Sequence, residues 1–182
     1  MKSVDIPKLA ELIGTLREKI TGVINSHKDK LAELEKTYRG ALELERETFE
    51  LTERHEKIVM DYKSGLISKD EALRESAPLR QTVESNSSYI FRAKRHYLSA
   101  ERTVKMLIPR YERLLSLAVR ASIRLEELSA EAEEQPSEEN GELISRLYEC
   151  VCSALTLIDR SGVSASELDS LITVFAASLN AS

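Results

Sequence analysis

The sequence predicts an all-α protein, a long antiparallel coiled-coil hairpin with a short C-terminal helical hairpin packed at its open end. Charged residues make up 31% of the chain and aromatic residues 5%, with four prolines and no tryptophan, a composition that favours long helices over sheets. Apolar residues recur at alternating steps of four and three through residues 79–132. This mean repeat of about 3.5 residues is typical of helices that pack lengthwise on a partner helix.

The first long helix is expected over about residues 6–63, which carry the same four-three step less regularly. Asp5 is suited to an N-cap, and Pro7 falls in the first turn, where its missing N–H costs nothing. Three glycines inside this segment each cost roughly 1 kcal/mol relative to alanine: Gly14, Gly22 and Gly40. The alternative to one continuous helix is therefore a helix that breaks near residues 22–26.

Residues 64–78 are expected to form the tip of the hairpin. Gly65 supplies the left-handed position that ends a helix, and Ser68 with Glu71 forms a capping box for a short helix over residues 69–75. A Ser-Ala-Pro sequence at 76–78 is expected to end that short helix. Three apolar residues of the tip are candidates for binding a protein partner, the alternative being that they cap the end of the coil: Leu66, Ile67 and Leu73.

The second long helix is expected over about residues 77–134. It contains a Ser-Asn-Ser-Ser run at 85–88 and Pro109, which are poor helix formers. Pro109 falls on the heptad position farthest from the packing stripe. We therefore expect a bend at Pro109 and no helix end.

The C-terminal region, residues 135–182, is expected to form a second domain that completes a four-helix bundle at the base of the hairpin domain, residues 1–134. A polar, acidic loop is predicted at 135–141 because it carries Pro and Gly. A helix over about 142–160 follows, and Ser164 with Glu167 forms a capping box for the last helix.

The two long helices are predicted to pair so that facing residue numbers sum to about 141. This register places His55 opposite Asn86, the one polar residue in the stripe of the second helix. A matched polar pair hydrogen-bonds and fixes register, whereas a lone buried polar group is costly. We therefore expect a buried polar layer of His55 and Asn86, the alternative being that each residue is separately tolerated at a partly hydrated position.

The charge distribution of the chain is uneven. Residues 126–182 contain 12 acidic residues and two arginines, a net charge of −10, so the rest of the chain carries +5 of the overall −5. Basic residues concentrate at 92–124, which suits a nucleic acid or an anionic membrane surface; the alternative is an ordinary solvated helix face. The candidate polyanion face consists of Arg92, Lys94, Arg95, Arg102, Lys105 and Arg113.

No catalytic, cofactor or metal motif is present in the sequence. The residues three positions before His27, His55 and His96 are not glutamates, which excludes the pattern of di-iron bundles, and no His-Glu-x-x-His or phosphate-binding loop occurs. The Cys-x-Cys at Cys150 and Cys152 is interpreted as two small core residues. We therefore expect no enzyme, no cofactor and no metal. No secretory signal and no apolar run of about 18 residues is found, so the cytoplasm is the expected location.

The function expected from this sequence is a non-catalytic scaffold or adaptor that binds protein partners and self-associates through the coiled-coil arm. Several large apolar residues lie off the packing stripe and favour a homo-oligomer, since monomers seldom leave contiguous apolar surface open: Tyr38, Leu42, Phe49, Tyr89, Phe91 and Leu98. The alternative is a polyanion-binding module that uses the basic face of the second helix. The sequence names no particular partner.

Overall fold

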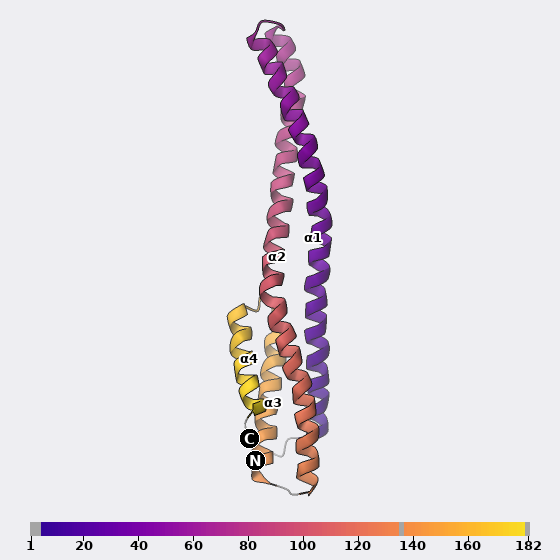
Figure 1. The fold of residues 1–182 in the computed structure, drawn as a ribbon, viewed down its shortest axis with the longest axis vertical. Helices are drawn as coiled ribbons and strands as arrows, with labels where there is room; N and C mark the ends of the chain where they lie inside the picture. The colour runs from indigo at the N-terminus through magenta and orange to yellow at the C-terminus, as the bar shows by residue number, and fades with distance from the viewer. Residues whose placement is uncertain (1–4, 135–136, 181–182) are drawn as a thin grey trace. The chain divides into compact units, whose positions relative to one another are not determined.

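The computed structural model describes residues 5–134 and 137–180, and the described residues form four helices and no strand (Figure 1). These are α1 (Ile6–Lys63), α2 (Lys69–Glu134), α3 (Glu138–Ile158) and α4 (Ala165–Asn180). The predicted all-α fold, two long helices followed by a short helical pair, is confirmed. The chain divides into a four-helix unit, Met1–Lys28 with Thr103–Ser182, and a two-helix unit, Asp29–Arg102.

Helix α1 begins and ends as predicted, and it is unbroken at residues 22–26. Asp5 directly precedes its first residue, and the Asp5 carbonyl accepts a hydrogen bond from the Leu9 N–H at 3.0 Å. A Cβ atom added at any of its three glycines would contact nothing within 4 Å. Among the described residues, no close packing therefore requires glycine at these positions.

Helix α2 begins at Lys69, so the separate short helix and the predicted break at residues 76–78 are wrong. Ser68 caps this helix, its Oγ accepting from the Glu71 N–H at 3.2 Å. Pro78 lies inside the helix and is exposed. A proline removes a single backbone donor, and the hydrogen-bonded turns on both sides of Pro78 continue the helix.

The turn between α1 and α2 has the geometry that the sequence predicts. Gly65 adopts a φ of 73°, a conformation that side chains with a Cβ rarely take. Its N–H donates to the Tyr62 carbonyl at 3.0 Å, and the Leu66 N–H donates to the Asp61 carbonyl at 2.9 Å. This pair of bonds is a Schellman motif, which satisfies the last carbonyls of α1.

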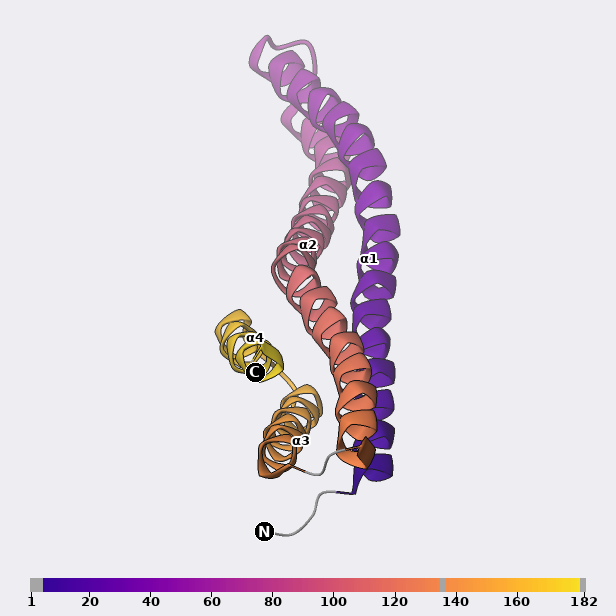
Figure 2. The same cartoon turned by 60° about the horizontal axis from the view of Figure 1, so that its bottom comes forward.

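The four-helix unit holds the main hydrophobic core. The C-terminal part of α2 packs with the start of α1, and α3 and α4 cover them on one side (Figure 2). Polar contacts join the helices at the surface: Lys19 pairs with Asp159, and Arg110 Nε and Nη2 both donate to Asp169 at 2.9 Å. The largest fully buried side chains are Phe175, Leu9, Ile13, Leu16, Ile20, Leu114, Leu128, Leu168 and Val151.

The two C-terminal helices differ slightly from their expected bounds. Helix α3 begins at Glu138, four residues before the predicted start, because Ser137 Oγ accepts from the Asn140 N–H at 3.1 Å and caps it there. The rest of the predicted 135–141 loop, residues 135 and 136, lies outside the described residues. Helix α4 follows the predicted capping box, in which the Glu167 N–H donates to Ser164 Oγ at 3.2 Å.

The two-helix unit consists of the remainder of α1 and α2, packed antiparallel and joined by the Gly65 turn. Its core is small: the buried apolar residues described there are Ala41, Ile90 and Ala93, with Leu44 packed against them. Two of these three buried side chains are a single methyl group. Larger apolar residues of this unit, such as Leu34, Leu51 and Val83, are only partly buried.

Candidate interaction surfaces

A polar layer is present at Asn86, but its partner is Thr48 and not His55. Asn86 Nδ2 donates to Thr48 Oγ1 at 3.0 Å, and the Thr48 hydroxyl donates to the Leu44 carbonyl at 2.7 Å. Thr48 is only 7% exposed, whereas His55 is partly buried. The predicted layer therefore exists with one of its two members replaced.

The change of partner is a shift of one heptad. Residues 48 and 86 sum to 134, seven less than the predicted 141. The short turn and the early start of α2 require this shift near the tip. A seven-residue repeat specifies the facing surfaces of two helices, but it cannot distinguish registers that differ by seven residues.

We call the row of residues through which the two helices face each other the seam. One flank of the seam carries an ion pair and an aromatic stack. Lys94 Nζ donates to both carboxylate oxygens of Glu45 at 2.6 and 2.7 Å. Tyr38 stacks on Tyr97 with ring centroids 4.6 Å apart and planes 4° apart. Tyr38 is thereby partly buried, which differs from its predicted exposure.

The other five side chains expected to be exposed in this unit are exposed. Their exposed fractions are 41% for Leu42, 63% for Phe49, 44% for Tyr89, 65% for Phe91 and 52% for Leu98. These large apolar residues therefore keep 41 to 65% of their surface in contact with water. They are available for contact with another molecule.

The tip residues predicted to bind a partner lie at the turn and in the first turns of α2. Leu66 is 73% exposed, Leu73 is 56% exposed and Ile67 is partly buried. Two of the three apolar side chains are therefore not used to close the end of the helix pair. Whether they bind a partner stays a prediction.

The candidate polyanion face is divided between the two units. Arg92, Arg95 and Arg102 are exposed in the two-helix unit, and Lys94 beside them is held by Glu45. Lys105 and Arg113 are exposed in the four-helix unit. Further along α2, arginines contact polar groups of the chain itself: Arg110 with Asp169, Arg120 with Asn180, and Arg124 with Glu127.

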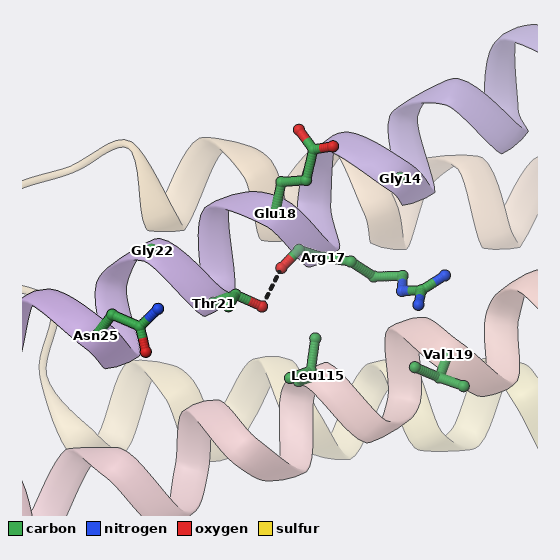
Figure 3. A pocket seen from close by; sticks show the side chains of 8 residues that line it. All are labelled: Gly14, Arg17, Glu18, Thr21, Gly22, Asn25, Leu115 and Val119. Atoms are coloured by element: carbon green, nitrogen blue, oxygen red, sulfur yellow. Dashed lines mark hydrogen bonds between the residues drawn. The ribbon is translucent and has the colours of Figure 1, made fainter.

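An open groove runs along the side of the four-helix unit formed by α1 and α2 (Figure 3). Its volume is about 720 Å³, and it continues into a second groove of about 540 Å³ that shares Gly14 and Arg17. Leu115 points across it toward α1, and the Thr21 hydroxyl donates to the Arg17 carbonyl at 2.9 Å. The only sequence signal for this groove is a pair of glycines that line it, Gly14 and Gly22, which have no side chains to fill it.

His27, Cys150 and Cys152 each contact another side chain of the protein. His27 stacks on Tyr111 with ring centroids 6.3 Å apart. Cys150 is buried in the core, with its Sγ 3.1 Å from Ser178 Oγ. A hydrogen bond with Cys152 raises the pKa of the Tyr148 phenol.

Among the residues that the structure describes, no group of three or more His, Cys, Asp or Glu side chains is arranged to hold a metal ion. The helices in the same residues include none with the length and apolar character needed to cross a membrane.

Comparison with known proteins adds no relative. No family model, no curated protein and no solved structure matches this chain.

Proposed function

We propose that this protein is a non-catalytic helical scaffold or adaptor that binds protein partners and self-associates through its two-helix unit. The observation that carries the proposal is a contrast between buried and exposed apolar residues. Of the described residues in this unit, three apolar residues are buried and nine large ones are exposed. The exposed set is Leu42, Phe49, Met60, Tyr62, Leu66, Leu73, Tyr89, Phe91 and Leu98.

A surface of this kind is costly for a helix pair that remains alone in water. Burial of apolar surface gives about 25 cal/mol per Å², and monomeric proteins rarely leave large contiguous apolar patches open. The four-helix unit differs, since its 24 buried apolar residues stand against four exposed large ones among those described. We therefore assign structural support to the four-helix unit and binding to the two-helix unit.

The location that we propose is the cytoplasm. The free thiols of Cys150 and Cys152 agree with this location, since disulfides are rare in cytoplasmic proteins.

Light scattering on the full chain over a range of concentrations tests the proposal. Self-association gives a mass above the 20.5 kDa of one chain, and it should persist when the salt concentration is raised, because apolar burial is not screened. The double change Leu66→Ser and Leu73→Ser should weaken capture of a protein partner while leaving the helix content unchanged. A chain that stays monomeric at all concentrations and binds no protein would contradict the proposal.

A second candidate function, binding of a polyanion, is favoured by the three exposed arginines of the two-helix unit. Charge reversal of Arg92, Arg95 and Arg102 should abolish any salt-dependent binding to anionic vesicles or nucleic acid. The matched control is reversal of three exposed basic residues on α1 in the same unit: Arg46, Arg54 and Lys57. Binding that is weakened equally by both sets, or that does not fall with salt, would exclude a specific polyanion face.

A further inference from the structure

Four of the exposed apolar side chains of the two-helix unit lie on a single face. Leu42 and Phe49 are one heptad apart on α1, and Phe91 and Leu98 are one heptad apart on α2. Each directly follows a residue of the seam, and in an antiparallel pair such positions turn to the same side of both helices. We call Leu42, Phe49, Phe91 and Leu98 the apolar face.

The ion pair of this unit confirms that these positions share a side. Glu45 lies four residues after Ala41, and Lys94 lies four residues after Ile90. These equivalent positions on the two helices meet at 2.6 Å, so this flank of α1 and this flank of α2 face the same way. The apolar face borders this flank and has a neutral ion pair at its centre.

The two halves of the apolar face are equivalent. Because α1 and α2 run in opposite directions, Phe49 and Phe91 both lie toward the tip, and Leu42 and Leu98 both lie away from it. A surface with the same chemistry on both of its helices is suited to an isologous contact, in which the same patch is used by both copies.

We propose that the apolar face binds a second copy of this chain, with the two arms side by side and both tips pointing the same way. This inference rests on the proposed function, in that it names the partner for self-association. In this arrangement α1 of one copy lies antiparallel on α2 of the other, as neighbouring helices do in an up-down bundle. Phe49 then contacts the partner's Phe91, and Leu42 contacts the partner's Leu98.

The charges at the centre of the face select this orientation over the reversed one. With both tips pointing the same way, Glu45 of one copy lies over the partner's Lys94, which gives four alternating charges. With the arms reversed, Glu45 would lie over the partner's Glu45 and Lys94 over the partner's Lys94. Like charges placed opposite one another across an interface are strongly disfavoured.

The exposed area agrees with what an interface of this kind needs. The four side chains are 41 to 65% exposed, which together is about two whole side chains, or on the order of 400 Å² per copy. A standard interface buries about 800 Å² per partner, of which a little over half is apolar. The apolar face therefore supplies most of the apolar part of one such interface.

Sedimentation velocity on the full chain tests the interface. The double change Phe49→Gln and Phe91→Gln should weaken dimerisation at least tenfold. The matched control, Met60→Gln and Tyr89→Gln, changes two apolar residues that are 62% and 44% exposed and lie at other heptad positions. It should leave dimerisation within about twofold. Circular dichroism on each variant reports whether the fold is retained. A monomeric wild type, or equal weakening by both pairs, would overturn the inference.

Cysteine crosslinking tests the orientation. In a background with Cys150→Ala and Cys152→Ala, a chain with Phe49→Cys is mixed with a differently tagged chain with Phe91→Cys. A disulfide-linked product with both tags is expected, and the mixture of Phe49→Cys with Leu42→Cys should give much less. The opposite preference would overturn the proposed orientation. Dimerisation that depends on Leu66 and Leu73, and not on the apolar face, would overturn this inference while leaving the proposed function in place.

Discussion

The two units of this protein use the same two helices in different ways. In the four-helix unit, α3 and α4 cover one side of the α1 and α2 pair, and the core includes fully buried Leu, Ile, Val and Phe side chains. The described part of the two-helix unit contains segments of α1 and α2 only, and its buried apolar residues are two alanines and one isoleucine. Similar helical repeats therefore yield a self-sufficient core in one place and an open surface in the other.

A heptad repeat thus determines which sides of two helices face each other, but not how much apolar surface the helices bury. In a pair of helices only the narrow stripe that faces the partner is removed from water. In a bundle each helix contacts more than one neighbour, so a wider stripe of its surface is buried. The two-helix unit therefore depends on half-buried apolar residues, such as Leu51 and Val83, and on polar contacts, such as that of Asn86 with Thr48.

The largest effect on stability is expected for Phe175→Ala in the four-helix unit. Phe175 is fully buried, and truncating a core phenylalanine costs about 3–5 kcal/mol. Urea unfolding followed by circular dichroism measures the change in free energy. The control is Val174→Ala, since Val174 is 57% exposed and should change stability by less than about 0.5 kcal/mol. Similar losses for the two variants would contradict the core described for this unit.

A smaller effect is expected for Ile90→Ala in the two-helix unit. Ile90 is 7% exposed and packs on alanines, so its loss should cost about 2 kcal/mol, the low end for buried isoleucines. Hydrogen exchange should show faster exchange for amides of residues 29–102 and little change elsewhere. Tyr89→Ala, at an exposed neighbouring position, is the control. Faster exchange throughout the four-helix unit would mean that the units are not separately stabilised.

The sequence predicted the elements of the fold well because the signals for them are local. The bounds of α1, the left-handed Gly65 and the capping box of Ser164 with Glu167 each depend on a few neighbouring residues, and the structure confirms all three. The helix end predicted at residues 76–78 is wrong. Pro78 is a local signal for a helix end, but the hydrogen-bonded turns before and after it continue the helix.

The candidate surfaces were predicted less completely because they depend on register. The sequence marked Asn86 as a polar break in the stripe. Choosing between Thr48 and His55 as its partner required the length of the turn, and the break wrongly predicted at residues 76–78 made the predicted turn too long. The exposure of Phe49 and Phe91 followed from their heptad positions. Their alignment on a single face could be deduced only once the ion pair of Glu45 with Lys94 was known.

The polar layer of the two-helix unit gives a smaller effect again. Asn86→Ala removes the hydrogen bond to Thr48 and should cost about 1 kcal/mol. The double change Asn86→Leu and Thr48→Val removes both polar partners and should restore stability to the wild-type value or above it, measured by thermal unfolding.

The register of the helix pair in the double variant tests the polar layer more directly than its stability does. The polar pair opposes a slip of one heptad, so after its removal the ion pair between Glu45 and Lys94 should be lost in part of the population. A disulfide engineered in the wild-type register should therefore form more slowly in the double variant than in the wild type. Equal rates would show that the turn at Gly65 alone determines the register.

The smallest expected effect is a pH dependence at the start of α4. Hydrogen bonds from the Ser164 N–H and the Ser164 hydroxyl, together with nearby Arg160, lower the pKa of Glu167. Because this pKa is lower in the folded than in the unfolded chain, the stabilisation is complete above the unfolded value of about 4.3. It is lost as the pH falls through the lower, folded pKa.

Glu167→Gln isolates this contribution. The variant keeps a side chain that accepts a hydrogen bond from Ser164 but cannot change its charge, so between about pH 5 and pH 3 its urea midpoint should fall less than that of the wild type. Ser164→Ala removes the hydroxyl and leaves the backbone N–H, so an intermediate slope is expected. The acid sensitivity should be confined to the four-helix unit, because this box caps a helix that the two-helix unit lacks. Identical slopes for the wild type and Glu167→Gln would show that the capping box adds no pH dependence to that unit.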